Sequence, residues 1–174
     1  MIDGKVILTD VDGVLLDWEY SFHLWMQDQG HYLQHNRQNE WDISARFNMS
    51  RDEGIRAIQV FNQSAVMGYL PAFRDAMHYA NKLVGLGYKF IAITSMGTDP
   101  YAVKLRQRNL EDLFGSRAFL DIHCLPIEAD KSQILKYYQK QYQGAFWIED
   151  KPENADLGAS LGYDTMMMHH LYNQ

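Results

Sequence analysis

The stretch KVILTDVDGVLLD, residues 5–17, is an apolar run that ends abruptly in two acidic residues, Asp10 and Asp12. The β-branched and aliphatic residues of KVILT are typical of a buried strand. Two carboxylates directly after such a strand point into one small volume, where like charges raise each other's pKa and destabilise the fold. The sequence therefore poses the question of what function needs both acids.

Length and charge limit the possible answers. The chain has 174 residues, of which 47% are hydrophobic, enough for one globular core with a small inserted subdomain. Its formal net charge is −6, and it contains no block of consecutive lysines and arginines. An extended nucleic-acid surface is therefore not expected, whereas a small anionic substrate held by a few local groups is compatible with this composition.

Cysteine content and apolar run length bear on the compartment. Cys124 is the only cysteine, so no intrachain disulfide can form. The longest apolar runs fall well short of the roughly 18 residues that span a bilayer. We therefore expect a cytoplasmic protein with no membrane partner, and the sequence leaves its oligomeric state open.

Strand and helix signals alternate from residue 72 onward. Helical spacing and stop signals predict helices at 73–87, 99–115 and 130–144, the last with Asp130 and Gln133 at capping-box spacing. Apolar runs predict strands at 5–9, 88–94, 118–123, 145–149 and 163–169. This alternation predicts an α/β fold with a Rossmann-like parallel sheet, helices on both faces and a binding crevice at the carboxyl ends of the strands.

Residues 18–71 interrupt the alternation with helical segments. We interpret them as an α-helical cap inserted after the first strand, so that residues 1–17 and 72–174 form the core domain. An insertion of this size is large enough to cover a site and too small to be an independent enzyme. The alternative is that these helices pack against the edge of the sheet.

Polar residues follow three of the predicted strands. They are Asp10 and Asp12 after the first strand, Thr94 and Ser95 after the second, and Glu149 and Asp150 after the fourth. If these strands are neighbours, the carboxylates crowd together, and hard oxygen ligands of this kind favour Mg²⁺. Mg²⁺ usually keeps waters and substrate phosphate among its ligands, so the cluster also predicts a phosphate-bearing partner.

Lys131 supplies positive charge at the start of a predicted helix, where backbone N–H groups also favour an anion. Together with a hydrogen bond from Thr94, it could neutralise phosphate oxygens that a metal ion does not reach. A metal, a lysine and a hydroxyl around developing charge are the parts that phosphoryl transfer needs. Taken alone, Lys131 is more typical of a solvated helix residue, and only its place between the third and fourth predicted strands favours a role at the site.

These residues resemble the four motifs of the haloacid dehalogenase superfamily, in order and at compatible spacing. The motifs are DVDGV after the first strand, the strand ending in Thr94, Lys131 on a helix, and WIEDKPEN at 147–154. The resemblance covers residues 4–16 and about 72–168. It implies that Asp10 is a nucleophile that forms an aspartyl-phosphate and that Asp12 is the general acid and base.

The same resemblance implies a Mg²⁺ site made by Asp10, the backbone carbonyl of Asp12, and Asp150, with Glu149 helping directly or through water. Thr94, Ser95 and Lys131 would bind the phosphate. An acid at position 12 favours phosphomonoester hydrolysis or phosphomutase chemistry, because the dehalogenases and transport ATPases of the superfamily lack it. The fourth motif is a variant, in which Asn154 replaces a frequent later acid.

A helical insertion after the first motif resembles the superfamily's cap type for small substrates. VDGVLLDW followed by an aromatic-rich cap is similar to the 5′(3′)-deoxyribonucleotidases, which implies a nucleoside monophosphate as substrate. Trp18, Phe22 and Trp41 are candidates for stacking on a base, and Arg46 for reading an anionic group. The alternatives are that these aromatic residues form the core of the cap and that the arginine is solvated.

The sequence thus predicts a Mg²⁺-dependent phosphatase that acts on a small phosphorylated metabolite through an aspartyl-phosphate. One alternative is a phosphatase of the same superfamily for sugar phosphates or nucleic-acid ends, the latter disfavoured by the lack of a basic patch. Another is a catalytically silent module that binds a phosphorylated ligand. Asp12 argues against silence, because a site that only binds has no need of an acid there.

Overall fold

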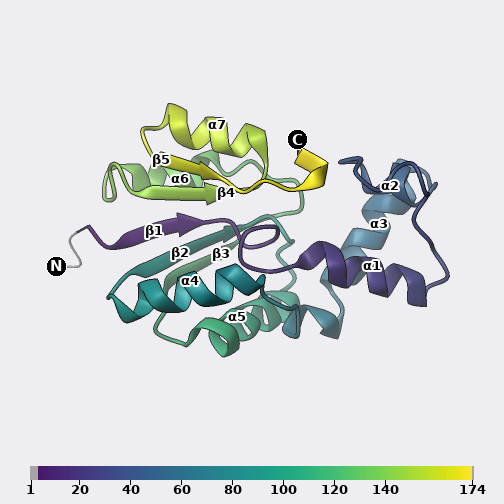
Figure 1. Cartoon of the computed structure of the whole chain (residues 1–174), viewed down its shortest axis with the longest axis horizontal. Helices are drawn as coiled ribbons and strands as arrows, with labels where there is room; N and C mark the ends of the chain where they lie inside the picture. The colour runs from purple at the N-terminus through teal and green to yellow at the C-terminus, as the bar shows by residue number, and fades with distance from the viewer. Residues whose placement is uncertain (1–3, 174) are drawn as a thin grey trace.

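The structure is a computed structural model that describes residues 4–173. Its five strands form a parallel sheet in the order β3-β2-β1-β4-β5 (Figure 1). The strands are β1 (Val6–Thr9), β2 (Lys89–Thr94), β3 (Phe119–Cys124), β4 (Phe146–Glu149) and β5 (Asp164–Met167). The predicted parallel sheet is confirmed. Because the strand order reverses at β1, a crevice is expected at its carboxyl end.

Helices cover both faces of the sheet, as predicted. The helices α4 (Arg74–Gly85) and α5 (Pro100–Phe114) pack on one face, and α6 (Ser132–Gln139) and α7 (Pro152–Ser160) pack on the other. Alternate residues of β2 serve the two layers, with Phe90 in one core cluster and Ile91 in the other. This period-2 alternation is what an apolar strand buried on both sides requires. Within residues 4–173, no helix is long and apolar enough to cross a membrane.

Two helices differ from the sequence-based expectation. The helix predicted at 130–144 begins at Ser132 and ends at Gln139, and Asp130 accepts a hydrogen bond from the Ser132 N–H at 2.7 Å without forming a capping box. The helix α7 was not predicted, although Pro152 stands at its first turn. Its apolar residues form no continuous stripe, so the helical period is weak there.

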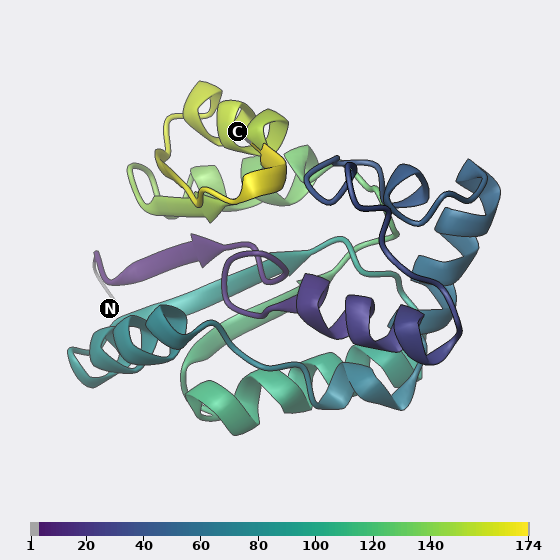
Figure 2. The same ribbon diagram turned by 45° about the vertical axis from the view of Figure 1, so that its right-hand side comes forward.

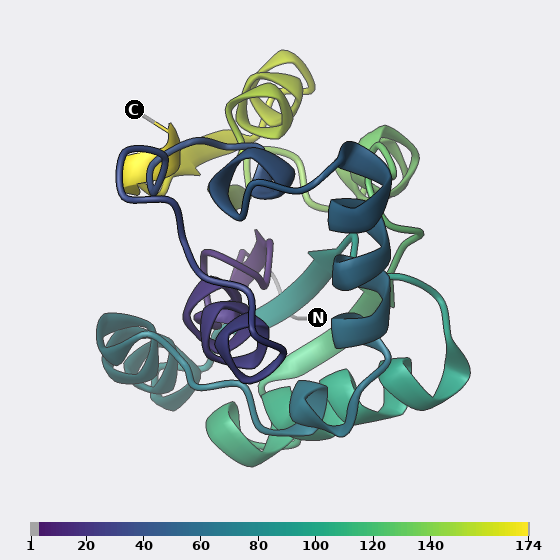
Figure 3. The same ribbon diagram turned by 90° about the vertical axis from the view of Figure 1, so that its right-hand side faces the viewer.

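The inserted segment lies beyond the carboxyl ends of the strands and not along a sheet edge (Figures 1 and 3). It contains α1 (Trp18–Asp28), α2 (Ile43–Arg46), α3 (Arg51–Asn62) and the short 3₁₀ helix η1 (Ala65–Gly68). The two crossings between insertion and core are held together by backbone hydrogen bonds, from Asp17 N to Pro71 O at 2.8 Å and from Phe73 N to Leu15 O at 3.1 Å. We call residues 18–71 the cap, and the exact division into domains stays a prediction.

Gly158 allows α7 to pack directly on β4, and this contact yields a test of the fold. A Cβ at Gly158 would overlap the Trp147 ring, whereas a Cβ at Gly85, also helical, would meet nothing within 4 Å. We expect Gly158→Ala to lower the free energy of unfolding by about 1–3 kcal/mol through overpacking. Gly85→Ala should leave it unchanged or raise it by up to about 1 kcal/mol. Urea denaturation of both variants measures the difference, and equal effects would contradict the packing described here.

Candidate active site

The loop after β1 begins the site. The Asp10 N–H donates to Ile148 O at 2.8 Å, which fixes the first acid beside β4, and the Asp10 carboxylate accepts a hydrogen bond from the Val11 N–H at 2.7 Å. Gly13 adopts a positive φ of 80°. A Cβ there would overlap the Asp150 carboxylate and lie 2.9 Å from the Tyr172 hydroxyl. Glycine is therefore needed both for the turn and for the close approach of the two chain segments.

Three buried carboxylates meet at the carboxyl ends of β1 and β4. Asp10, Glu149 and Asp150 each offer an oxygen, and these oxygens all lie within 4.8 Å of one another. The Lys131 ammonium lies among them, 2.7 Å from Asp10 Oδ2 and 2.9 Å from Glu149 Oε2. The cluster thus holds more negative than positive charge in a buried place, and further positive charge would stabilise it.

The pKa shifts express this imbalance. Burial, followed by the Glu149 charge, raises the pKa of Asp10 well above its ordinary value, and Lys131 only partly opposes the shift. Burial and the Asp10 charge raise the pKa of Asp150 to about 6. Burial alone would lower the pKa of Lys131, but the Asp10 and Glu149 carboxylates raise it, so the lysine remains charged. The negative charges of Asp10 and Asp150 are therefore not fully compensated within the cluster.

The donor set fits a hard divalent cation such as Mg²⁺, which binds oxygen ligands and commonly uses one or two carboxylates. Asp10 and Asp150 suit this role. Glu149 suits it less, because Oε2 accepts from Lys131 while Oε1 accepts from the N–H groups of Asp150 and Lys151, both at 3.1 Å. Its hydrogen bonds make Glu149 an anchor for Lys131 and for the loop after β4.

Asp12 has a different partner from Asp10, and sequence reasoning missed it. The Arg106 guanidinium makes two hydrogen bonds to the Asp12 carboxylate, at 2.6 and 3.1 Å. The arginine side chain is fully buried, whereas 27% of the Asp12 side chain remains exposed. A signal was present in the sequence, because Arg106 stands midway between the buried Ala102 and Leu110 on the apolar stripe of α5, where a charge needs a buried partner.

The hydroxyls after β2 have separate roles. Thr94 Oγ1 donates to Asp12 Oδ2 at 3.3 Å, so the structure brings Thr94 to the site as the sequence predicts. The Ser95 hydroxyl instead donates to Ala129 O at 3.0 Å, in the loop before α6. That bond ties the end of β2 to the loop between β3 and α6. Any contribution of Ser95 to phosphate binding would therefore come from its backbone.

A cavity of about 470 Å³ lies between the core and the cap. Asp12, Gly13 and Asp150 line it from the core side. The cap residues singled out by sequence line it from the other side; these are Trp18, Phe22, Trp41 and Arg46. The structure therefore gathers the candidate substrate residues at one cavity with two of the candidate catalytic loops.

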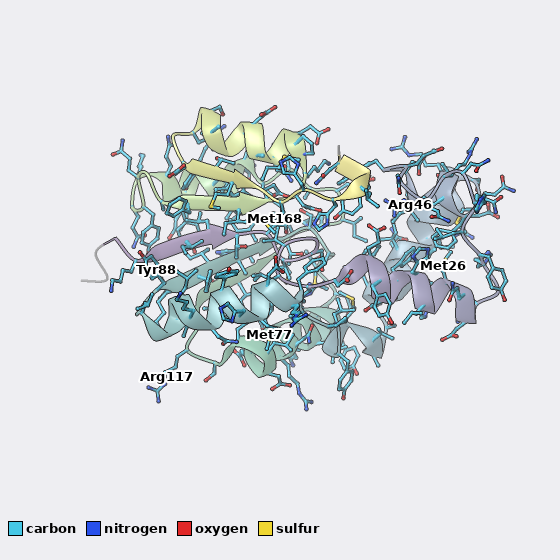
Figure 4. The ribbon with its side chains drawn as sticks, in the orientation of Figure 1. Met26, Arg46, Met77, Tyr88, Arg117 and Met168 are labelled. Atoms are coloured by element: carbon cyan, nitrogen blue, oxygen red, sulfur yellow. The ribbon has the colours of Figure 1, made fainter. Side chains whose placement is uncertain are left out.

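The four cap residues differ in how exposed they are and in whether other side chains already bind them. Trp18 donates through Nε1 to Asn62 Oδ1 at 2.8 Å and stacks on Phe22 at 4.7 Å between ring centroids, so both rings belong largely to the core of the cap. Trp41 is 49% exposed. Arg46 is buried and pairs with Glu19 at 2.6 Å, so the alternative of a solvated arginine is wrong (Figure 4).

The C-terminal turn, residues 170–173, reaches the site from a direction that no motif predicted (Figure 2). The Tyr172 hydroxyl donates to Asp150 Oδ2 at 2.7 Å. The Asn173 amide donates to the Asp150 carbonyl at 2.6 Å, and His170 Nε2 lies 2.6 Å from Gly13 O. The turn thus contacts both acidic loops. Its sequence carries no signal of this placement, because the contacts form only when β5 lies beside β4.

No family model matches the chain. An uncharacterised 32.4 kDa protein of enterobacteria phage T4, encoded in the gp30–rIII intergenic region, is 32% identical over 160 residues. The match covers 89% of this chain but only 57% of the phage protein. The chain therefore spans little more than half the length of this uncharacterised relative.

Solved structures similar to the chain share its fold at low sequence identity. A haloacid dehalogenase-like hydrolase of Streptococcus pneumoniae superposes with a TM-score of 0.64 at 16% identity, covering 96% of this chain and 85% of the other. CbbY of Rhodobacter sphaeroides, solved with phosphate, has a TM-score of 0.59 at 17% identity, covering 98% and 88%. A predicted phosphatase of Clostridium acetobutylicum has a TM-score of 0.62 at 14% identity, covering 94% and 83%. The chain therefore has the haloacid dehalogenase-like fold.

Proposed function

We propose that the chain is a Mg²⁺-dependent phosphatase that hydrolyses a small phosphomonoester through an aspartyl-phosphate. The observation that carries this proposal is the cluster of Asp10, Glu149 and Asp150 around Lys131, next to a cavity of about 470 Å³. The names of the structural neighbours support it, since several are hydrolases or phosphatases and CbbY was solved with phosphate. At 13–17% identity these neighbours establish the fold, and the activity rests on the residues of this chain.

The proposed reaction has two steps. In the first, an Asp10 carboxylate oxygen attacks phosphorus, the bond to the leaving oxygen breaks, and Asp12 gives that oxygen a proton. In the second, Asp12 takes a proton from water, whose oxygen attacks phosphorus and releases Asp10 and inorganic phosphate. Lys131, 2.7 Å from Asp10, neutralises charge on the phosphoryl oxygens, and Thr94 contributes a hydrogen bond beside Asp12.

Mg²⁺ held by Asp10 and Asp150 would supply positive charge to the phosphate oxygens. Glu149 keeps Lys131 in place through its hydrogen bond of 2.9 Å. These roles assign one function to each charged group of the cluster. They also account for a cluster in which carboxylates outnumber ammonium groups.

The substrate we propose first is a nucleoside monophosphate, with a sugar phosphate as the alternative. Trp41, half-exposed at the cavity, offers a ring face for a base, and Trp18 lines the same cavity. Arg46 is less suited to read a second anion, because Glu19 already neutralises it. A cytoplasmic location and a small phosphorylated metabolite as partner remain predictions of the sequence.

The first test is release of inorganic phosphate with Mg²⁺ present, from an aryl phosphate and from panels of nucleotides and sugar phosphates. We expect turnover by the parent protein and turnover at background level for Asp10→Asn, because an amide oxygen is a poor nucleophile for phosphorus. Unchanged turnover in this variant would remove Asp10 as nucleophile. A parent that binds phosphorylated ligands without releasing phosphate would establish the silent binding module.

The second test separates the chemistry of Asp12 from its ion pair. Asp12→Asn should slow phosphate release by about 10²–10⁴-fold through loss of the acid and base. It should also destabilise the fold, because leaving a buried charge such as that of Arg106 unpaired costs about 3–5 kcal/mol. The loss should be smaller here, because the Asn side-chain oxygen can still accept one hydrogen bond from Arg106.

The double variant Asp12→Asn with Arg106→Met removes the buried charge as well, and we expect it to recover stability but not turnover. Urea denaturation and phosphate release measure the two properties separately. Recovery of turnover together with stability would show that Asp12 has only a structural role.

The third test uses the raised pKa of Asp150. Because that pKa rises from 3.8 to about 6 in the folded protein, the stability this group contributes is full below its unfolded pKa and is lost as pH rises through about 6. With a chelator above pH 7, Asp150→Asn should therefore raise the free energy of unfolding by roughly 2 kcal/mol.

With Mg²⁺ present, the parent protein should instead be more stable than Asp150→Asn. Mg²⁺ should raise the melting temperature of the parent protein more above pH 7 than at pH 5, where a proton competes for Asp150, and it should do little for Asp150→Asn. Thermal melts at both pH values, with and without Mg²⁺, test this expectation. An equal Mg²⁺ effect on parent and variant would exclude Asp150 as a ligand.

A further inference from the structure

Tyr172 contacts the core with one end of its side chain and the cap with the other. Its hydroxyl donates to Asp150 Oδ2 at 2.7 Å. Its ring lies 5.5 Å from the Arg46 guanidinium carbon and 5.5 Å from the Trp41 ring centroid. The C-terminal turn and the cap loop, residues 29–42 between α1 and α2, lie side by side in both rotated views (Figures 2 and 3). One residue therefore links the candidate metal site to the wall of the candidate substrate cavity.

The core end of this link is tightly held. The His170 ring stacks on the Tyr172 ring, with centroids 4.9 Å apart and planes within 14°, and His170 Nε2 lies 2.6 Å from Gly13 O. Asn173 donates to the backbone carbonyl of Asp150 at 2.6 Å. Because the hydroxyl donates to Oδ2, it restricts the orientation of the Asp150 carboxylate.

The cap end of the link involves buried charge. Arg46 is 4% exposed and pairs with Glu19 of α1 at 2.6 Å, so its position is coupled to the first helix of the cap. The Tyr172 ring offers this guanidinium a π face, and such a contact is worth more when it is shielded from water. Trp41 extends the contact, and the Lys151 ammonium lies 5.9 Å from the Trp41 ring centroid. The cap loop is therefore fixed on the C-terminal turn.

We propose that Tyr172 is a positioning residue that couples the placement of the cap to the orientation of Asp150. Its hydroxyl sets the carboxylate, and its ring holds Arg46 and Trp41. The metal half of this inference rests on the proposed function, whereas the cap half does not. Removal of the hydroxyl alone should therefore affect cation binding, and removal of the ring should also loosen the cap.

The hydroxyl is tested by Tyr172→Phe, with Tyr163→Phe as the matched control. Tyr163 also donates a buried hydroxyl hydrogen bond, to Leu135 O at 2.6 Å on the opposite face of the sheet. In calorimetric titration with Mg²⁺, we expect Tyr172→Phe to bind about 10–100-fold more weakly than the parent, as is typical when an outer partner of a metal ligand is removed. Tyr163→Phe should bind Mg²⁺ as the parent does, although its melting temperature should change about as much as that of Tyr172→Phe.

Unchanged Mg²⁺ affinity in Tyr172→Phe, or an equal loss in both variants, would overturn the positioning role of the hydroxyl. A parent protein that binds no Mg²⁺ would overturn the metal site of the proposed function and the metal half of this inference with it. The two kinds of failure can be told apart, because the first is seen in the variants and the other in the parent protein itself.

The ring is tested by amide hydrogen exchange of residues 34–49, which needs neither metal nor substrate. Tyr172→Leu removes the π face, so exchange in this cap segment should become faster than in the parent, while exchange in α5 remains unchanged. Tyr172→Phe keeps the ring and should leave the cap segment as protected as in the parent. Equal protection in all three proteins would overturn the coupling to the cap.

Discussion

Three buried carboxylates meet where β1 and β4 end, and a single ammonium pairs with two of them. The arrangement of the rest of the site follows from this crowding. The sheet order places β1 directly beside β4, so Asp10 and Asp150 must converge whatever the cap does. Lys131 compensates part of the charge, and the N–H groups at Asp150 and Lys151 compensate part of Glu149. Burial and the remaining negative charge raise the pKa of Asp10 and Asp150. Under the proposed function, a bound cation would compensate this charge.

The two acids that follow β1 are tolerated because they do not share a counter-ion. Asp10 faces Lys131, and Asp12 faces the forked guanidinium of Arg106, which is rooted in a helix on the opposite side of the sheet from α6. Side chains two positions apart in an extended strand would point to the same face, but β1 ends at Thr9, and the acids lie in the turn that follows it, where they reach different partners. The separate partners agree with the separate roles proposed for the two acids, Asp10 as nucleophile and metal ligand and Asp12 as general acid and base.

The sequence was sufficient for the elements whose information is local. Alternating apolar runs predicted the five strands to within about two residues, and the residues after those strands predicted the acids and Lys131 at the site. It was insufficient where a contact depends on tertiary approach. Arg106 contacts Asp12, which lies 94 positions away in the sequence, and Tyr172 contacts Asp150, which lies 22 positions away. No local sequence pattern predicts contacts at such separations. The helix α7 was missed because packing on Trp147, and not an apolar stripe, stabilises it.

Charge pairing in the cap bears on what the cavity can accept. Arg46 is neutralised by Glu19, and the Lys151 ammonium lies over the Trp41 ring, so two of the cations that line the cavity already have partners. A second phosphate that binds to Arg46 or Lys151 would have to displace one of these contacts, which costs desolvation and a buried partner. An uncharged base or sugar needs no such exchange and can use the exposed ring of Trp41. Under the proposed function, a second phosphate on the substrate would therefore have to use Arg51, the remaining arginine or lysine that lines the cavity, and not Arg46 or Lys151.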